Sequence, residues 1–545
     1  MVQKAKKILL LNMPNTVIDD YELAKYVLDR QTVSNVPYGL LSLCSYVRKY
    51  SKNDAVMRIF DLNEEMCKAY YDKKVDTKNR VFEVLNQEIR RFRPDIVGIS
   101  IMFNVSYMYL NPVVASVKNI DNNIVVIVGG NLATSLYEEI LQDENIDCVC
   151  YGEGEMPLTQ LVDSENVMLQ IAENPAFVTR DKIKAGTEPA NVMVQDLDSI
   201  PPIDFEFINL SAYKGPMTRF FQRDDSERVE DPTTLVIYTT RGCPYKCCFC
   251  ACHVVHGKQV RFMSIEKVLS DVQLMIDRYR ITCLMINDDN FLIHKDRAKT
   301  ILRKLKALDL KVVFPSLLIR NIDEEIAGLL KEVGVSNQLV SIESGSDYVL
   351  KNLIQKPLRK DQIFTAVENM RKHGISVDTN VIIGFPGETD EHRQETLKTI
   401  YDVGFNWSHF LIVLPVPGSS LYRQCKENNY LVNYDNFYSP NLSQCNIRTP
   451  DYDPEHIQKQ AYMMNLHANY VHNYNLRMEN FDECILHFSN ILKSVPDHAF
   501  AYYGLAKAYE GKGDFAAARS NMARFEEISR SDPFWKGYAD YFGLL

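Results

Sequence analysis

Short apolar runs alternate with amphipathic stretches over residues 6 to about 165. The apolar runs are rich in Val and Ile and end in turn residues: KILLL, VMRIFDL, DIVGISIM, NIVVIVGG and DCVCYGEG. Continuous apolar runs of this length are typical of strands buried on both faces. The stretches between them, such as YGLLSLCSYVRKY and VFEVLNQEIRRF, have helical spacing. This alternation predicts an α/β layer with a parallel sheet, of flavodoxin-like or Rossmann-like doubly wound type.

A second alternating series begins near residue 234. Its apolar runs are LVIY, CLMIN, KVVFP, QLVSI, TNVIIGF and FLIVLP, and helical stretches separate them. Six strand–helix units predict a partial (β/α)6 barrel, whose chemistry is expected at the carboxyl ends of the strands. Residues 195–233 are rich in Pro, Asp and Ser and are interpreted as a linker.

The strand pattern stops near residue 446, and the remainder is predicted to be helical. Two of its segments align at a spacing of 34 residues, and YYGLAKAYEGKGDFAAA resembles a tetratricopeptide repeat. Such units need neighbours to bury their faces, so we expect the tail to pack on the barrel or on Tyr-rich helices such as ANYVHNYN. The predicted divisions are 1–194, 195–233, 234–445 and 446–545.

Composition narrows the functional classes. The chain has 545 residues, of which 46% are apolar and 24% charged, and a net charge of -10. That length predicts several domains, and the acidic balance argues against nucleic acid as a partner. The apolar run Ile8–Leu11 is too short for a secretory signal, and no run is long enough to span a membrane. We therefore predict a cytoplasmic protein without a membrane partner, whose 13 cysteines are free thiols or metal ligands.

Five cysteines lie within ten positions of RGCPYKCCFCAC. Cys243, Cys247 and Cys250 have C-x3-C-x2-C spacing just after the first barrel strand. Three thiolates on one short loop can bind three irons of a [4Fe-4S] cluster and leave the fourth iron open. The alternative is a structural zinc site completed by His253. Cys248 and Cys252 fall outside the spacing and are predicted, like Cys283, to pack as small buried side chains.

The cysteine loop resembles that of radical S-adenosylmethionine (SAM) enzymes. The stretch from Arg241 to Cys250 follows the Arg-Gly-Cys-Pro-x-x-Cys-x-Phe-Cys form. The resemblance implies a [4Fe-4S] cluster whose open iron binds SAM. It also implies SAM contacts from the loop and from successive strand ends, although each strand-end stretch alone could be a turn or a helix cap. The residues implied are Phe249, Asp288, Asp289, Glu343, Ser344, Gly384 and Pro386.

The first domain resembles the cobalamin-binding domain of B12-dependent radical SAM enzymes. The order PDIVGIS, VGGNLAT and YGEGE carries the resemblance, together with the Pro-x-Gly-Leu stretch in VPYGLL. Taken singly, each glycine pair is better explained by a tight strand-to-helix turn. The residues implied to bind cobalamin are Pro37, Gly39, Leu40, Ser100, Gly129, Gly130, Asn131, Gly152, Glu153, Gly154 and Glu155.

One departure from the B12 mutase pattern bears on the cobalt. The Asp-x-His-x-x-Gly segment is absent: the second strand ends Asp61-Leu62-Asn63, and the first histidine of the chain is His253. Histidine is the usual strong nitrogen donor to such a metal. We therefore expect a base-off cobalamin with no protein His ligand, its lower face open or held by water or a weak side-chain ligand.

The resemblance implies a methyltransferase. A 5'-deoxyadenosyl radical from SAM would act on an unactivated carbon, or on phosphorus, of a small-molecule or peptide substrate, with methylcobalamin as methyl donor and a flavodoxin or ferredoxin as electron donor. Oxidative cyclisation or ring contraction without methylation is the alternative, and a cobalamin and iron–sulfur sensor with a partner-binding tail is a third hypothesis. No general acid or base is assigned among His253, His256, His409 and Tyr422.

Overall fold

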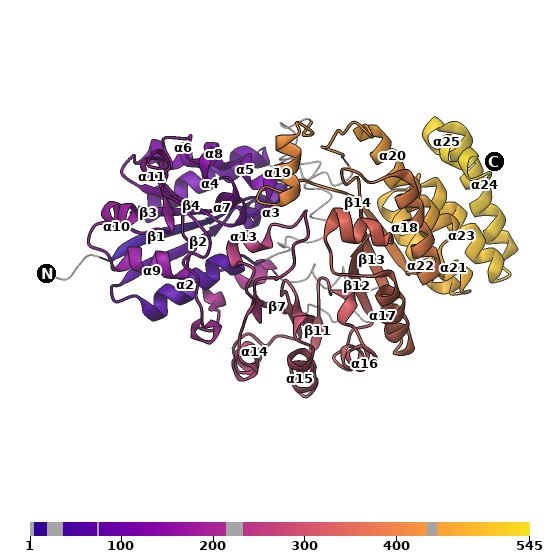
Figure 1. Cartoon of the computed structure of the whole chain (residues 1–545), viewed down its shortest axis with the longest axis horizontal. Helices are drawn as coiled ribbons and strands as arrows, with labels where there is room; N and C mark the ends of the chain where they lie inside the picture. The colour runs from indigo at the N-terminus through magenta and orange to yellow at the C-terminus, as the bar shows by residue number, and fades with distance from the viewer. Residues whose placement is uncertain (1–4, 19–35, 73–75, 214–232, 433–443) are drawn as a thin grey trace. The chain divides into compact units, whose positions relative to one another are not determined.

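The computed structural model describes residues 5–18, 36–72, 76–213, 233–432 and 444–545 (Figure 1). Residues 214–232 of the predicted linker lie outside the described residues. The chain forms two compact units. Unit 1 comprises residues 1–315, 332–335 and 415–441, and unit 2 comprises residues 316–331, 336–414 and 442–545. None of the helices in the described part of the chain combines the length and apolar character needed to cross a bilayer.

Unit 1 contains the predicted doubly wound sheet. Its strand order is β2-β1-β3-β4-β5-β6, with β1 to β5 parallel and β6 antiparallel to β5. The strands are β1 (Lys6–Asn12), β2 (Ala55–Asp61), β3 (Ile96–Ser100), β4 (Val125–Gly129), β5 (Cys148–Cys150) and β6 (Phe177–Val178). The helices that pack on them include α2 (Tyr38–Tyr50), α4 (Thr77–Phe92), α6 (Leu110–Ile120) and α9 (Glu155–Asp163).

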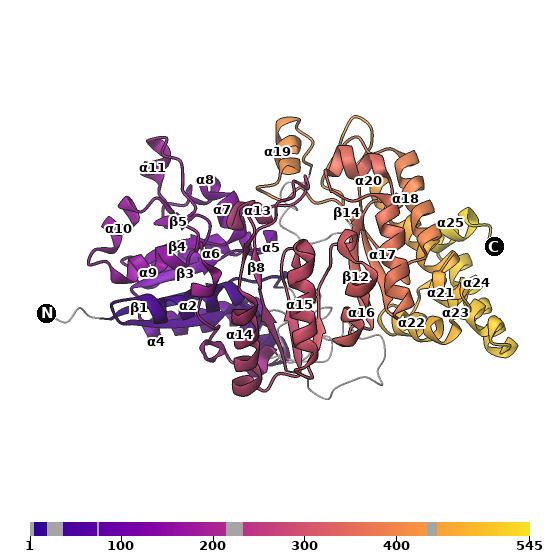
Figure 2. The ribbon, with the colours of Figure 1, turned by 60° about the horizontal axis from the view of Figure 1, so that its bottom comes forward.

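Alternate side chains of β1 enter two separate cores. Ile8 and Leu10 pack with residues of α2 and α9, whereas Leu9 and Leu11 pack with residues of α4 and α6. All four side chains are at most 3% exposed. The sheet is therefore covered on both faces, as its Val/Ile-rich strands predict, and Figure 2 shows α2 and α4 on opposite sides of it.

The cysteine loop belongs to the second part of unit 1. Strands β7 (Thr234–Ile237), β10 (Cys283–Ile286) and β11 (Lys311–Val313) form a parallel sheet in the order β11-β10-β7. After β7, β8 (Thr240–Arg241) pairs antiparallel with β9 (Arg261–Phe262), and the loop between them carries the cysteines and α13 (Cys252–His256). Helices α14 (Ile265–Tyr279) and α15 (Lys295–Lys306) join the strands.

Unit 2 contains the other three barrel strands. β12 (Asn337–Glu343), β13 (Ser376–Ile383) and β14 (Trp407–Ile412) pair in parallel, with α17 (Lys360–Lys372) and α18 (Asp390–Val403) between them. All six predicted strands are thus present and form two three-stranded sheets in the described residues. The predicted fold class is confirmed: an N-terminal doubly wound domain, a central (β/α)6 segment and a helical C-terminal region.

The helical tail packs on a barrel strand, as expected. α20 (Pro454–Leu466) leads into α22 (Phe481–Ser494), α23 (Ala499–Gly511), α24 (Phe515–Ser531) and α25 (Pro533–Tyr541). Their core contains Phe488, Phe500 and Phe525, and Trp407 of β14 packs against it. Asn469, within ANYVHNYN, forms two hydrogen bonds with the backbone of Ser408, which neighbours Trp407. The predicted division boundaries and the cytoplasmic location stay predictions.

Candidate functional site

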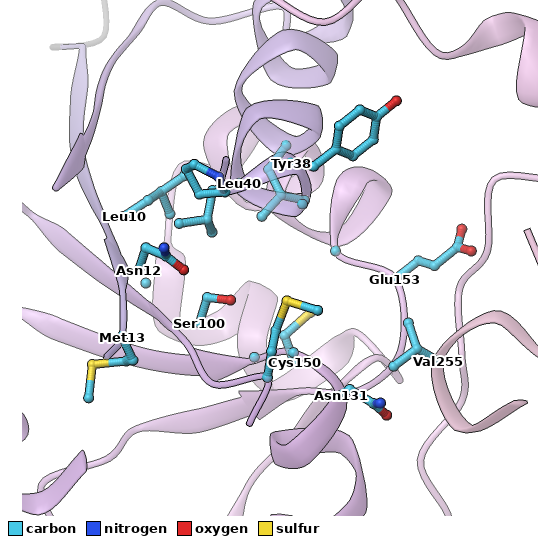
Figure 3. Close-up of a pocket in the computed structure, with 18 of the residues that line it drawn as sticks. Leu10, Asn12, Met13, Tyr38, Leu40, Ser100, Asn131, Cys150, Glu153 and Val255 are labelled. Atoms are coloured by element: carbon cyan, nitrogen blue, oxygen red, sulfur yellow. The ribbon is translucent and has the colours of Figure 1, made fainter. Parts of the chain in front are cut away.

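A cavity of about 580 Å³ lies in unit 1 at the carboxyl ends of β1, β3, β4 and β5 (Figure 3). Carboxyl ends of parallel strands are the usual ligand sites of doubly wound sheets. All the residues that the cobalamin resemblance implied line this cavity: Pro37, Gly39, Leu40, Ser100, Gly129, Gly130, Asn131, Gly152, Glu153, Gly154 and Glu155. The sequence therefore predicted one wall of a real cavity, from residues more than a hundred positions apart.

Two glycines shape the wall. Gly130 has a φ of +103°, and a Cβ there would lie 2.5 Å from the carbonyl oxygen of Ile101. Gly152 has a φ of +78°, and its Cβ would lie 2.1 Å from Oδ1 of Asn191. A side chain at either position is both strained and obstructed. Glycine is required at these turns for the close packing of neighbouring strand ends around the cavity.

Asn131 also lines the cavity (Figure 3). Its Oδ1 is covered by the surrounding chain and has no hydrogen-bond partner among the described residues. A buried polar group without a partner costs roughly 1–3 kcal/mol. This oxygen is therefore a local cost of the fold at the edge of the cavity.

Glu153 and Glu155 direct their carboxylates at the cysteine segment. Oε1 of Glu155 accepts hydrogen bonds from Arg241 Nη2 at 2.6 Å and from Ser42 Oγ at 2.8 Å. Glu153 forms ion pairs with Arg241 at 3.2 Å and with Arg261 at 2.5 Å. Both glutamates and both arginines are buried. These carboxylates line the cavity, but their strongest partners belong to the chain itself.

The arginines determine the charge of this network. Burial raises the pKa of Glu153, but hydrogen bonds from His256 and Arg261 and the charge of Arg241 outweigh it and hold the pKa well below its usual range. Burial likewise works against the charge of Arg241, and the two glutamates overcome it and raise its pKa. The shifts of Glu153 and Arg241 therefore both favour the charged form of the pair. It joins the strand end after β5 to β8, two residues before Cys243.

The three predicted cluster ligands lie on one loop, and a turn joins two of them. Cys243, Cys247 and Cys250 are half-buried, and the Cys250 amide donates to the Cys247 carbonyl at 3.1 Å. The carbonyl of Cys248 accepts hydrogen bonds from the backbone of Leu421 at 2.9 Å and from Ser420 Oγ at 3.2 Å. The segment after Leu414, which begins with PVPGSS (residues 415–420), therefore supports the cysteine loop. Its sequence alone did not reveal this role.

The sequence predicted the same role, a small buried side chain, for Cys248 and Cys252. The structure gives the two cysteines different surroundings. Cys248 is 7% exposed, and burial raises its pKa to about 12. Cys252 is half-buried, lines the cavity, and forms thiol hydrogen bonds with Cys243 and Cys250, which raise its pKa. The prediction that Cys252 packs as a buried side chain is wrong, because it rested on the ligand spacing alone. The chain turns into α13 at Cys252 and brings its thiol back to the ligands.

The cluster and the zinc site ask for different sets of ligands. A structural zinc site needs four ligands around one point, whereas three cysteines can bind three separate irons of a [4Fe-4S] cluster. The C-x3-C-x2-C spacing of Cys243, Cys247 and Cys250 is the reason to expect the cluster, and this assignment stays a prediction. Of the four acid–base candidates, His256 lines the cavity, where its Nδ1 lies 2.9 Å from Oε1 of Glu153.

The two consecutive aspartates that follow β10 have different contacts. Asp288 accepts hydrogen bonds from the amide and hydroxyl of Thr239, each at 2.5 Å, and from the Thr240 amide at 3.1 Å. Desolvation raises its pKa to about 6. Asp288 thus fixes the chain just before the cysteine loop, whereas Asp289 lines the cavity. Phe249 lies half-buried within the loop.

The strand end after β12 lies in unit 2. Glu343 is buried, has a φ of +65°, and forms an ion pair with Lys356 at 2.8 Å. Ser344 Oγ lies 3.0 Å from Thr396 Oγ1. A non-glycine residue with positive φ is uncommon and strained. The strain is in the backbone of Glu343, and the buried lysine holds its carboxylate in place.

The strand end after β13 is closed by its own glutamate. The amide of Gly384 donates to Oε2 of Glu388 at 2.6 Å, across a turn that contains Pro386. Arg393 lies 3.3 Å from the same oxygen, while Oε1 of Glu388 is buried and has no hydrogen-bond partner in the described part of the chain. Burial raises the pKa of Glu388 to about 7. Tyr452 donates a hydrogen bond to the carbonyl of Gly384 and so attaches the tail of unit 2 to this turn.

Two family models match the chain. The Radical SAM superfamily model matches residues 237–400, and the B12 binding domain model matches residues 55–162. An uncharacterized methyltransferase of Pyrococcus horikoshii is 30% identical over 354 residues, which cover 64% of this chain and 73% of that protein. The cytidylyl-2-hydroxyethylphosphonate methyltransferase of Streptomyces wedmorensis is 26% identical over 509 residues, covering 86% and 90% respectively.

Solved structures share the fold at low sequence identity. The radical SAM methyltransferase TsrM from Kitasatospora setae, with cobalamin and a [4Fe-4S] cluster bound, has a TM-score of 0.57 at 15% identity, covering 78% of this chain and 75% of that one. The cobalamin-dependent SAM radical enzyme OxsB, with aqua-cobalamin and SAM bound, has a TM-score of 0.61 at 13% identity, covering 96% and 84%.

Proposed function

The chain belongs to the cobalamin-binding radical SAM family, and we propose that it is a methyltransferase that uses both cofactors on one substrate. The observation that carries the proposal is the composition of the cavity wall. Asn12, Ser100 and Gly129 come from the B12-type sheet, whereas Cys252 and Asp289 come from the segment that carries the cysteine loop. Residues of both parts therefore line one cavity within a single compact unit.

The cavity wall suits a large, mostly apolar cofactor with a polar rim. Ligand sites typically combine a volume of roughly 300–1,000 Å³ with a few placed polar groups. Gly130 and Gly152 keep side chains out of the wall, and Asn12 and Ser100 are polar residues that line it. We assign cobalamin to these strand ends. Glu153 and Glu155 would form the wall that joins this site to the cysteine loop rather than bind the cofactor by their charge.

Cys243, Cys247 and Cys250 would hold the cluster. When bound, the cluster supplies the electron that breaks a carbon–sulfur bond of SAM, and cobalamin supplies the methyl group for the substrate. Asp289 is the better of the two aspartates for the SAM ammonium, because Asp288 already accepts three hydrogen bonds from the chain. Phe249, Glu343, Ser344, Gly384 and Pro386 remain proposed SAM contacts, and Lys356 would orient Glu343 for this role.

The substrate class is proposed from a relative. The Streptomyces wedmorensis protein, matched over 86% of this chain, is named for methylation of a cytidylyl-2-hydroxyethylphosphonate. We propose a small molecule with an unactivated carbon as the methyl acceptor here, and a small redox protein such as flavodoxin or ferredoxin as electron donor.

Removing the ligands tests the cluster assignment. Cys243, Cys247 and Cys250 are replaced together by Ala, and the protein is purified anaerobically with hydroxocobalamin. We expect iron, labile sulfide and reductive cleavage of SAM to be lost, and cobalamin to be retained. The matched control is Cys248→Ala, which changes a buried cysteine of the same loop. Continued formation of 5'-deoxyadenosine by the triple variant would refute the assignment.

Isotopic labelling tests the methyl transfer. Methyl-deuterated SAM, a reductant and a panel of phosphonate and small-molecule acceptors are incubated with the loaded enzyme. A product that carries the labelled methyl group is the expected result. A product of lower mass with no label would instead indicate oxidative cyclisation or ring contraction. The absence of 5'-deoxyadenosine under all conditions would favour a sensor.

A further inference from the structure

The polar floor of the cavity lies where the sheet reverses its winding. β1 lies between β2 and β3, so the chain moves to one side of β1 for β2 and to the other side for β3, β4 and β5. At such a switch point the loops diverge and leave a crevice for the central part of a ligand. Asn12 ends β1 and Ser100 ends β3, and they are partners in the β1–β3 register. Both line the cavity.

Asp61 fixes the orientation of the Asn12 amide. Asp61 is the register partner of Asn12 on β2, and its Oδ2 accepts a hydrogen bond from Asn12 Nδ2 at 3.0 Å. Only the amino group of an asparagine can donate to a carboxylate, so the amide oxygen faces the other way. Figure 3 shows Asn12 and Ser100 next to each other at the floor of the cavity.

Asp61 itself is held in place by further donors. Tyr213 donates from its hydroxyl at 2.6 Å, and Asn63 donates from its backbone amide at 2.8 Å and its side chain at 2.9 Å. Asp61 is 5% exposed and therefore cannot exchange these partners for water. A carboxylate held in this way orients the group that it binds, as outer partners do for metal ligands.

The imidazole at the cavity does not compete for this position. His256 is engaged through Nδ1 by Glu153, and its chain neighbour Val255 lies with Glu153 on the opposite side of the cavity from Asn12 (Figure 3). Both belong to the wall formed with the cysteine segment. The group at the switch point is therefore an oxygen donor rather than an imidazole.

We propose that Asn12 faces the lower axial position of the cobalt in bound cobalamin. Its amide oxygen, with the hydroxyl of Ser100 beside it, makes a weak oxygen contact there, directly or through one water. Asp61 is the positioning residue that aims this oxygen at the metal. The inference rests on the proposed function, because it requires cobalamin in this cavity.

A histidine placed at this position tests the geometry. Asn12→His protein is loaded with cobalamin, reduced to the cob(II)alamin state, and examined by electron paramagnetic resonance. Each cobalt hyperfine line is expected to split into a nitrogen triplet, whereas the wild-type protein is expected to give unsplit lines. Asn131→His is the matched control, because it places the same imidazole at the end of β4 in the same cavity. It is expected to give the unsplit wild-type spectrum.

The other outcomes each decide the question. An unsplit spectrum from Asn12→His with cobalamin bound overturns the inference, as does a triplet from Asn131→His. If Asn12→His does not fold or load, Asn12→Ala replaces it, and its cob(II)alamin hyperfine splitting must differ from that of the wild type. An unchanged splitting overturns the inference. Failure of wild-type protein to bind cobalamin is a separate result, since it contradicts the proposed function instead.

Discussion

Two strand ends with similar sequences use their glutamates in opposite ways. In the GEGE turn after β5, Glu153 forms ion pairs with Arg241 and Arg261, which lie about ninety residues or more further along the chain. After β13, GFPGET folds Glu388 back onto the amide of Gly384, four residues before it. A glutamate in a glycine-rich turn can thus either join two distant segments or close its own turn. The number of cations that it meets determines which charge state it holds.

The pKa values follow from this difference. Glu153 contacts two arginines and a histidine, and its pKa lies well below the usual range. Glu388 meets one arginine at 3.3 Å in a buried position, and burial raises its pKa to about 7. Burial is similar at the two sites, at 3% and 2% exposure. The distinction is therefore the supply of positive charge and not access to water.

Neutralising Glu153 should have the largest effect. Glu153→Gln leaves Arg241 and Arg261 buried with less compensation, and breaking a buried ion pair costs about 3–5 kcal/mol. We expect a loss of this size in the free energy of unfolding, measured by urea denaturation of the apoprotein at pH 7. The control is Glu83→Gln, whose exposed pair with Arg80 is worth at most about 1 kcal/mol. Equal losses in the two variants would contradict the account of the network.

Neutralising Glu388 should act through pH instead. A carboxyl whose pKa is raised on folding stabilises the protein at low pH, and this contribution is lost as the pH rises through the folded value. The window therefore runs from the unfolded pKa near 4.5 to about 7. We expect wild-type stability to fall by about 2 kcal/mol across this window. Glu388→Gln should remove most of that slope in thermal unfolding at pH 5 and pH 7, and an unchanged slope would contradict a raised pKa.

The glycines of the two regions offer a second contrast. Gly130 stands beside the cavity, whereas a Cβ on Gly384 would lie 2.9 Å from Ile457 of the tail. Gly130→Ala should weaken cobalamin binding at least tenfold, about 1.4 kcal/mol, because the strained turn shifts the cavity wall. Gly384→Ala should destabilise the fold and leave cobalamin affinity unchanged. Spectrophotometric titration with hydroxocobalamin measures both affinities.

Gly39 provides the matched control for the cavity. It lines the same wall, but a Cβ there would have nothing within 4 Å, and its φ is not positive. Gly39→Ala should bind cobalamin as the wild type does. A loss of affinity equal to that of Gly130→Ala would show that the cavity tolerates no added methyl group, and that backbone strain is not the cause.

The sequence predicted the elements and the cavity wall, because both depend on local patterns. Apolar runs identify the strands, and parallel strands place their carboxyl ends on one edge, so Ser100, Gly129 and Gly152 were found together. The partners of the side chains were not predictable in this way. That Arg241 binds Glu155, or that Asp61 orients Asn12, depends on which segments the tertiary fold brings into contact.

Cys252 shows the same limit within a single loop. Spacing alone separated it from the three ligands, and the start of α13 returned its thiol to them. The geometry of the turn distinguishes Cys252 from the buried Cys248, and the three residues between them (249–251) do not determine this geometry. The two glutamates and the two cysteines therefore teach the same point. The residue type predicts which chemical roles a side chain can have, and its tertiary contacts determine which role it has.

Replacing Cys252 should have the smallest effect. Cys252→Ala removes a thiol that is hydrogen-bonded to Cys243 and Cys250 but lies outside the ligand spacing. Because three ligands remain, we expect unchanged iron and sulfide content. SAM affinity should change by no more than a few-fold, about 1 kcal/mol or less, since the lost contacts are weak thiol hydrogen bonds.

Iron and sulfide analysis and equilibrium binding of SAM measure these quantities, with Cys248→Ala beside it as the buried control. Loss of the cluster from Cys252→Ala alone would contradict the three-ligand assignment, because it would make Cys252 a fourth ligand. The iron that SAM needs would then be closed in the resting protein. The Cys252→Ala variant thus distinguishes a cluster with three protein ligands, whose fourth iron can bind SAM, from a cluster with four.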